Sequence, residues 1–108
     1  MRFGDWYPLS TARDLPDGET VLQLRLATGL VDYARGKSAM VWYQHAINTE
    51  DAARALAVRF AAHDLVCRHL IEVDAGVDLQ AFCAKLRGDF ERRFGSVPLY
   101  EQQQPQAP

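Results

Sequence analysis

The sequence predicts a small α+β domain, in which a mainly antiparallel sheet of three strands is flanked by helices. Leu22, Leu24 and Leu26 share one face of a strand at 20–26, as Leu65, Cys67, His69, Ile71 and Val73 share one face of a strand at 65–73. Residues 39–45 are rich in β-forming residues. Residues 49–62 and 79–94 carry apolar side chains at helical spacing. The resulting order of strand, strand, helix, strand, helix favours helices packed over an antiparallel sheet.

The composition is typical of a single domain, which we place at residues 1–100. The chain has 108 residues, of which 48% are hydrophobic and 24% are charged, and its formal net charge is −2. A slightly acidic chain does not favour nucleic acid as a partner, although Arg87, Arg92 and Arg93 leave a local basic face open. No stretch is apolar enough for a leader or a bilayer span, so we expect a cytoplasmic protein that does not enter a membrane.

The two ends of the chain are predicted to be less regular than its middle. Residues 1–19 read as an irregular lead-in, in which Leu15-Pro-Asp-Gly-Glu19 has turn chemistry because proline presets one backbone angle and glycine permits a positive one. The tail at 101–108 has almost nothing to bury, so we expect it to be mobile.

Residues 27–38 join the first two strands and read as a long hairpin connection, since they contain Gly29 and Gly36. The triplet Gly36-Lys37-Ser38 also matches the end of a phosphate-binding loop. That motif needs a glycine five residues before Gly36, where Val31 stands, and a helix after it, whereas a β-rich run follows here. The triplet therefore indicates a solvated turn rather than a nucleotide site.

Both helices have recognisable ends. Asn48 or Thr49 can cap the first helix, which we expect to run to about residue 62. Asp78 is expected to cap the last helix and Gly95 to end it. Gly88 in its interior costs about 1 kcal/mol relative to alanine, which leaves a break at that point open.

Side chains that bind metals or stack on bases are present, but without a complete motif. His63, Cys67 and His69 are close in sequence, yet no fourth ligand has a recognisable spacing, so core packing is the better interpretation than a zinc site. The aromatic residues could stack on bases or pack in the core, and the absence of a basic background favours packing. These aromatic residues are Trp6, Tyr7, Trp42 and Tyr43.

Four segments resemble motifs of one enzyme family. Val21–Arg25 and Trp42–Gln44 lie on the first two predicted strands, Arg59–His63 lies on the first helix, and Pro98–Glu101 follows the last helix. They resemble the Gly-Ile-Tyr strand, the Tyr-Ile-Gly strand, the Arg-Leu-x-x-His pattern and the closing Pro-x-Tyr-Asn of the GIY-YIG nuclease domain. The resemblance covers about residues 18–101 and implies the same order of elements.

The resemblance implies a catalytic set of Tyr43, Arg59, Asp89 and Glu91, in which Arg59 contacts the scissile phosphate. Asp89 or Glu91 would take the place of the glutamate that holds one divalent metal, so Mg²⁺ is the cofactor expected of an active member. No cofactor is expected otherwise. The same resemblance makes Trp42, Lys37 and His63 the expected substrate-binding residues.

The departures from the family motifs affect the chemistry. Leu22 stands where the first tyrosine would be and cannot position water. Trp42 stands where the second would be, and Tyr43 replaces it only if the strand register slips by one residue. Losing a catalytic acid or base costs about 10²–10⁴-fold in rate, so we expect a degenerate copy that serves as a binding or scaffold module.

Two alternative functions stay open, a divergent metal-dependent DNA endonuclease and an unrelated protein-interaction domain. The partner would be nucleic acid or a protein, and a homodimer is open.

Overall fold

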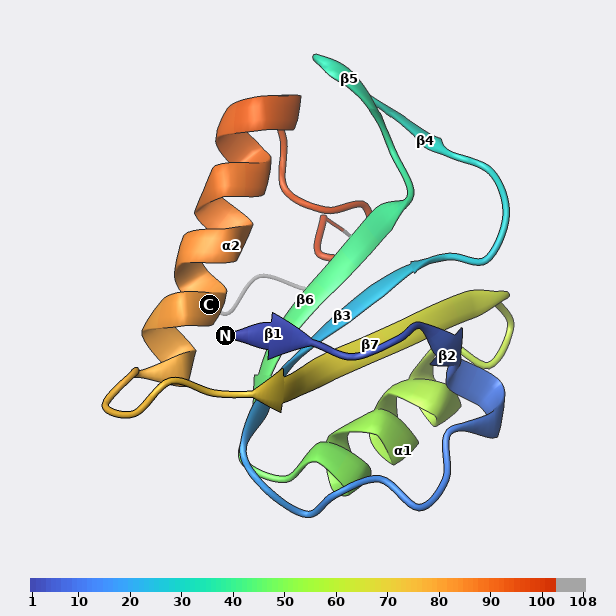
Figure 1. The fold of residues 1–108 in the computed structure, drawn as a ribbon. Coiled ribbons are helices and arrows are strands. Elements are labelled where there is room, and N and C mark those ends of the chain that lie inside the picture. The colour runs from blue at the N-terminus through green and yellow to red at the C-terminus, as the bar shows by residue number, and fades with distance from the viewer. Residues whose placement is uncertain (103–108) are drawn as a thin grey trace, which may run out of the picture.

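Three long antiparallel strands form the centre of the sheet, with β3 (Thr20–Leu26) between β6 (Met40–Ala46) and β7 (Leu65–Glu72). The structure is a computed structural model that describes residues 1–102, and its overall arrangement is seen in Figure 1. The remaining elements are two helices, α1 (Thr49–Arg59) and α2 (Leu79–Phe94), four short strands, β1 (Arg2–Phe3), β2 (Tyr7–Pro8), β4 (Val31–Tyr33) and β5 (Gly36–Ser38), and one 3₁₀ turn at Leu9–Thr11.

The pairing of β3 on both sides explains why it is the most buried strand. Leu22 lies opposite Gln44 of β6 and opposite His69 of β7, so the backbone of β3 is hydrogen-bonded along both edges. Val21, Leu22 and Leu24 have no exposed surface at all. Because successive side chains point to opposite faces, burial of both faces divides the core in two.

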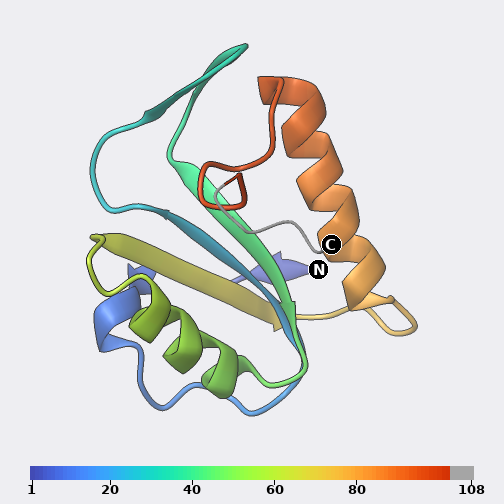
Figure 2. The ribbon, with the colours of Figure 1, turned by 180° about the vertical axis from the view of Figure 1, so that it is seen from behind.

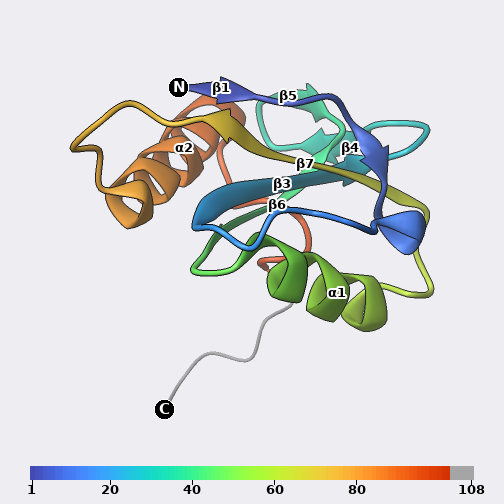
Figure 3. The ribbon, with the colours of Figure 1, turned by 60° about the horizontal axis from the view of Figure 1, so that its bottom comes forward.

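The two helices cover opposite faces of this sheet, as Figure 3 shows from below. The core on the α1 face contains Leu22, Leu24, Trp42, Leu56 and Phe60, together with Leu9, Val41, Ala46, Leu65, Cys67 and Tyr100. The core on the α2 face contains Val21, Tyr43, Leu70, Cys83 and Phe90, together with Tyr33 and Leu79. The α+β class and the antiparallel pairing are thus confirmed.

The predicted count of three strands is wrong, because the lead-in and the connection also form strands. β1 and β2 both pair with β7, and Tyr7 lies opposite Cys67, so the main sheet has five strands. β4 and β5 form a separate hairpin between β3 and β6. Strands of two or three residues are too short to display alternation, which is why the pattern at 1–19 indicated irregular chain.

The hairpin packs against the end of α2 and so covers that helix terminus. The backbone N–H of Arg35 donates to the carbonyl of Phe94 at 3.0 Å, and its guanidinium donates to the carbonyl of Arg92 at 2.5 Å. Carbonyls at a helix C-terminus have no partner within the helix, so these bonds satisfy them. Gly36, whose φ is +150°, permits this close turn beside the ring of Phe94.

The helix signals in the sequence were accurate. Asn48 accepts a hydrogen bond from the N–H of Asp51, and Asp78 accepts from two N–H groups of the first turn of α2. Gly95 ends α2 in the left-handed conformation with φ of +81°, and Gly88 lies within an unbroken helix. α1 ends at Arg59, three residues earlier than predicted.

The tail that the sequence predicts at 101–108 begins with a residue that is bonded to the rest of the domain. Glu101 is half-buried and bonded to α2 and β6, while residues 103–108 lie outside the described part of the chain. No helix within residues 1–102 is both long and apolar enough to cross a membrane.

His69 belongs to a buried polar group beneath the N-terminal segment. Its Nδ1 lies 2.9 Å from the hydroxyl of Tyr7, and the thiol of Cys67 lies 3.5 Å from the same hydroxyl. Burial lowers the pKa of His69 and raises the pKa of Cys67 to about 11. These three groups are therefore uncharged at neutral pH.

We expect the lowered pKa of His69 to make the fold less stable in weak acid. Below about pH 6.5, the ordinary pKa of histidine, the unfolded chain binds a proton at His69 more readily than the folded chain does. The free energy of unfolding therefore decreases as the pH is lowered. The slope for one proton is at most about 1.4 kcal/mol per pH unit. Urea unfolding from pH 7 to pH 5 measures it. The difference in stability between the wild type and His69→Gln should shrink as pH falls, and a constant difference would contradict the assignment.

Candidate functional site

β6 is an edge strand whose outer backbone groups are bonded by side chains instead of by another strand. Arg87 of α2 donates through Nη2 to the carbonyl of Tyr43 at 2.7 Å, and the N–H of Tyr43 donates to Glu101 at 3.3 Å. Arg87 and Glu101 also form an ion pair through Nε and Oε1. We call this arrangement the Arg87–Glu101 clamp. It satisfies the edge at Tyr43, where an exposed strand would otherwise invite pairing.

The chain after α2 positions Glu101 in the clamp by returning to β6, as seen from behind in Figure 2. The N–H of Tyr100 donates to the carbonyl of Val41, and the turn is closed by bonds from Glu101 and Gln102 to the carbonyl of Pro98. The hydroxyl of Tyr33, from the hairpin, accepts from the N–H of Leu99 at 3.0 Å. The C-terminal turn is thereby fixed to both the hairpin and the sheet edge.

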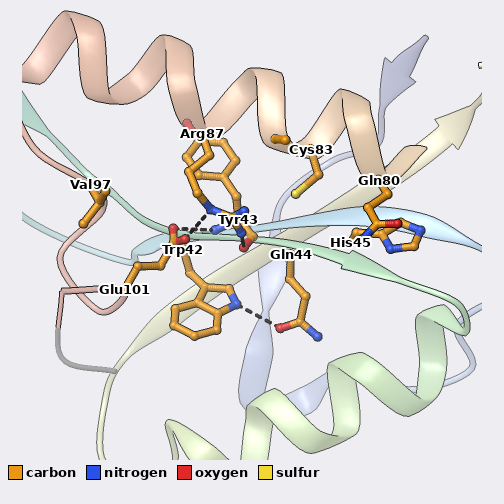
Figure 4. A pocket seen from close by; sticks show the side chains of 10 residues that line it. Trp42, Tyr43, Gln44, His45, Gln80, Cys83, Arg87, Val97 and Glu101 are labelled. Carbon is orange, nitrogen blue, oxygen red and sulfur yellow. Dashed lines mark hydrogen bonds and ion pairs between the residues drawn. The ribbon is translucent and has the colours of Figure 1, made fainter. Parts of the chain in front are cut away.

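A pocket of about 640 Å³ opens along β6 between α2 and the C-terminal turn (Figure 4). Its polar walls come from Gln44 and His45 of β6, Gln80 and Arg87 of α2, and Glu101. A neighbouring hollow of about 570 Å³ shares Gln44 and His45 and extends along the strand toward the start of α1. The two hollows follow the free edge of β6, so this surface could accommodate an elongated ligand.

The charges in this pocket offset one another. Burial raises the pKa of Glu101, and the positive charge of Arg87 opposes that rise. Burial raises the pKa of Tyr43 to about 12, and the negative charge of Glu101 contributes to the increase. His45 Nε2 lies 2.5 Å from a carboxylate oxygen of Glu19. At neutral pH the Tyr43 phenol is therefore protonated and cannot serve as a general base.

The structure separates Tyr43 from Arg59, the two residues that a nuclease reading would bring together. Tyr43 faces α2 and packs against Phe90, with ring centroids 6.0 Å apart. Arg59 lies at the end of α1 on the other face, where its guanidinium carbon is 4.8 Å from the centroid of Trp42. The sheet stands between them because Trp42 and Tyr43 are successive residues of one strand.

Three residues expected from the family resemblance do gather on the α1 face. Arg59 lies over Trp42, and the His63 ring lies 4.8 Å from the ring of Tyr100 with its Nδ1 3.2 Å from the Tyr100 hydroxyl. Trp42 is buried, and its indole N–H donates to Gln44 at 3.0 Å. Phe60 stacks between these groups, so the arrangement is an aromatic cluster with a cation and an imidazole at its rim.

Asp89 and Glu91, either of which was expected to bind metal, have different surroundings on α2. Asp89 is paired with both Lys85 and Arg92, while Glu91 is exposed. Residues two apart on a helix point in different directions, so the two carboxylates do not converge. Within residues 1–102, no three side chains of the metal-binding types come together.

Lys37 lies in β5 of the hairpin, opposite Asp32 of β4. It is exposed and its ammonium is 3.5 Å from Asp32. Two residues that build the pocket, Arg87 and Glu101, were not predicted to act together. The sequence gives one indication of their pairing. Arg87 lies one turn after Cys83 and just before Phe90, on the face of α2 that points to the core. A cation at such a position needs a polar or charged partner.

The chain matches no protein-family model, no curated protein and no solved structure in comparisons with known proteins.

We expect removal of the charge at Glu101 to lower the pKa of Tyr43. The carboxylate disfavours the phenolate nearby, and Glu101→Gln removes that repulsion while keeping a group of similar size. The pKa should stay above the ordinary value of 10, since burial is the larger cause. An NMR titration of the Tyr43 ring measures this shift, with Glu91→Gln as the control. An unchanged Tyr43 pKa in Glu101→Gln would mean that the Glu101 carboxylate does not act on the Tyr43 phenol.

Proposed function

We propose that this chain is a GIY-YIG-like domain that has lost catalysis and acts as a binding module in the cytoplasm. The observation that carries the proposal is the pocket along the free edge of β6, whose backbone is held by the Arg87–Glu101 clamp. The two thiols, Cys67 and Cys83, are buried and free, which suits a reducing compartment.

The arrangement of the expected catalytic residues supports a loss of chemistry. Phosphodiester cleavage needs an activated nucleophile, a cation on the phosphate and usually a metal at one point in space. Tyr43 and Arg59 lie on opposite faces of the sheet, and Asp89 is neutralised by two basic neighbours. A protonated Tyr43 also lacks the basicity that the reaction requires.

The chemistry of the pocket suits an extended peptide segment of a partner protein. Gln44, Gln80 and His45 offer neutral hydrogen-bonding groups, and the charges of Arg87 and Glu101 offset one another. A peptide in extended conformation presents alternating N–H and carbonyl groups, which match these side chains. The elongated shape of the two adjoining hollows fits such a chain.

The alternative of an unrelated interaction domain would rest on an exposed apolar patch. Trp6 and Tyr7, which were candidates for such a patch, are half-buried against arginines and His69. Large exposed apolar side chains occur on the hairpin, before α1, on α1 and near the end of β7. They are Leu30, Ile47, Val58, Ile71, Val73 and Val77. The pocket along β6 therefore remains the better-supported site.

We expect the purified protein not to nick plasmid DNA in the presence of Mg²⁺ or Mn²⁺, because no described residues assemble a cleavage site. Gel analysis of supercoiled plasmid over time measures this. Arg59→Ala is the matched variant that separates the protein's own activity from a contaminating nuclease. Nicking by the wild type that disappears in Arg59→Ala would contradict the proposal.

We expect a bulky side chain at Ala84 to block peptide binding. Ala84 is an exposed residue of α2 that lines the pocket, whereas Ala81 is exposed on the same helix and does not line it. Peptides selected from a random display library on the wild-type protein should bind Ala84→Trp at least about tenfold more weakly, a loss of about 1.4 kcal/mol. Their affinity for Ala81→Trp should be unchanged. Equal affinities for the two variants would exclude the pocket as the binding site.

A further inference from the structure

Two arginines meet on the face of the sheet that α2 does not fully cover. Arg25 of β3 and Arg68 of β7 lie on the same face, since Arg68 is opposite Gln23 and Arg25 is two residues further along β3. Both approach the ring of Trp6, in the segment between β1 and β2. Their guanidinium carbons are 4.1 Å and 4.5 Å from its centroid. The two charges are therefore separated by no more than the sum of these distances.

Neither arginine has a carboxylate partner within residues 1–102. All the ion pairs found in this part of the chain are made by other basic groups. Asp5, which adjoins Trp6 in sequence, is exposed and forms no ion pair with either arginine. Arg68 donates its Nε to the neutral amide of Gln23 at 2.6 Å. No side-chain hydrogen bond of Arg25 is found in the same part of the chain, so several guanidinium N–H groups stay available.

These two cations lie close together although the chain as a whole is slightly acidic. The sequence carries 14 acidic residues against 12 Lys and Arg, yet none of the described carboxylates neutralises this pair. Burial lowers the pKa of Arg68, and the positive charge of Arg25 lowers it further. Contact with an aromatic face holds one cation at about 0.5–1 kcal/mol, but it does not remove the repulsion between two.

We propose that Arg25 and Arg68, beside Trp6, bind the phosphate group of a small phosphorylated molecule. Guanidinium groups present parallel N–H donors that match phosphate oxygens in pairs, and two cations suit a dianion. All three residues are half-exposed, so the phosphate reaches them from solvent. None of these three residues lines the pocket along β6, so the site stands independently of the peptide-binding proposal.

The experiment is an NMR titration of the full 108-residue chain with inorganic phosphate at constant ionic strength, kept by exchange with sodium chloride. The indole N–H of Trp6 should shift saturably with a dissociation constant on the order of a millimolar. Arg25→Gln should weaken binding by about tenfold, because it removes one charge and keeps part of the side-chain stem. Arg25→Lys keeps the charge and should bind more tightly than Arg25→Gln. Arg93→Gln is the matched control, since Arg93 is exposed and has no carboxylate partner among the described residues.

Two results would overturn the proposal. A Trp6 signal that does not respond to phosphate, or that responds linearly without saturation, excludes a defined site. If Arg25→Gln binds phosphate with the same affinity as Arg93→Gln, then Arg25 does not form part of the phosphate site. The spectra of each variant report whether it is folded, and Arg68→Gln provides a second variant should Arg25→Gln unfold.

Discussion

The pairing of β3 with β6 on one side and β7 on the other is the constraint on which the rest of the structure depends. A strand bonded along both edges and buried on both faces leaves no freedom of register, because a slip of one residue would move Leu22 and Leu24 to the face of α2. Pairing with β3 also fixes which side chains of β6 and β7 point to each face. The positions of Trp42 and Tyr43, and therefore of every group that packs against them, follow from the register of β3.

This constraint separates the residues that a nuclease would need in one place. Arg59 and His63 meet Trp42 and Tyr100 on the face of α1, while Tyr43 meets Arg87 on the face of α2. The C-terminal turn reaches both sides, with Tyr100 packed on one face and Glu101 bonded at the edge. The outer edge of β6 adjoins the pocket, and its backbone at Tyr43 is held by the Arg87–Glu101 clamp.

Local signals in the sequence predicted what depends on neighbouring residues. The caps at Asn48 and Asp78 and the stop at Gly95 need only a few adjacent groups. The sequence predicted Asp78 and Gly95, and it gave Asn48 as one of two candidates beside Thr49. The strands at β1 and β2 exist because β7 offers an edge to them, which no property of a two-residue segment reveals. The clamp was missed for the same reason: Arg87 and Glu101 are 14 positions apart and meet only when the turn returns to β6. The family resemblance pointed to Arg59 and Tyr43 but carried no information on which face each would occupy.

The most direct test of this account is a nuclear Overhauser measurement of which aromatic rings contact Tyr43 and Trp42. The account requires contacts between the rings of Tyr43 and Phe90, and between the rings of Trp42 and Phe60, whose centroids are 6.0 Å and 5.2 Å apart. Contacts of Tyr43 with Phe60 or with the side chain of Arg59 would contradict it, because they would place the tyrosine and the arginine on one face of the sheet.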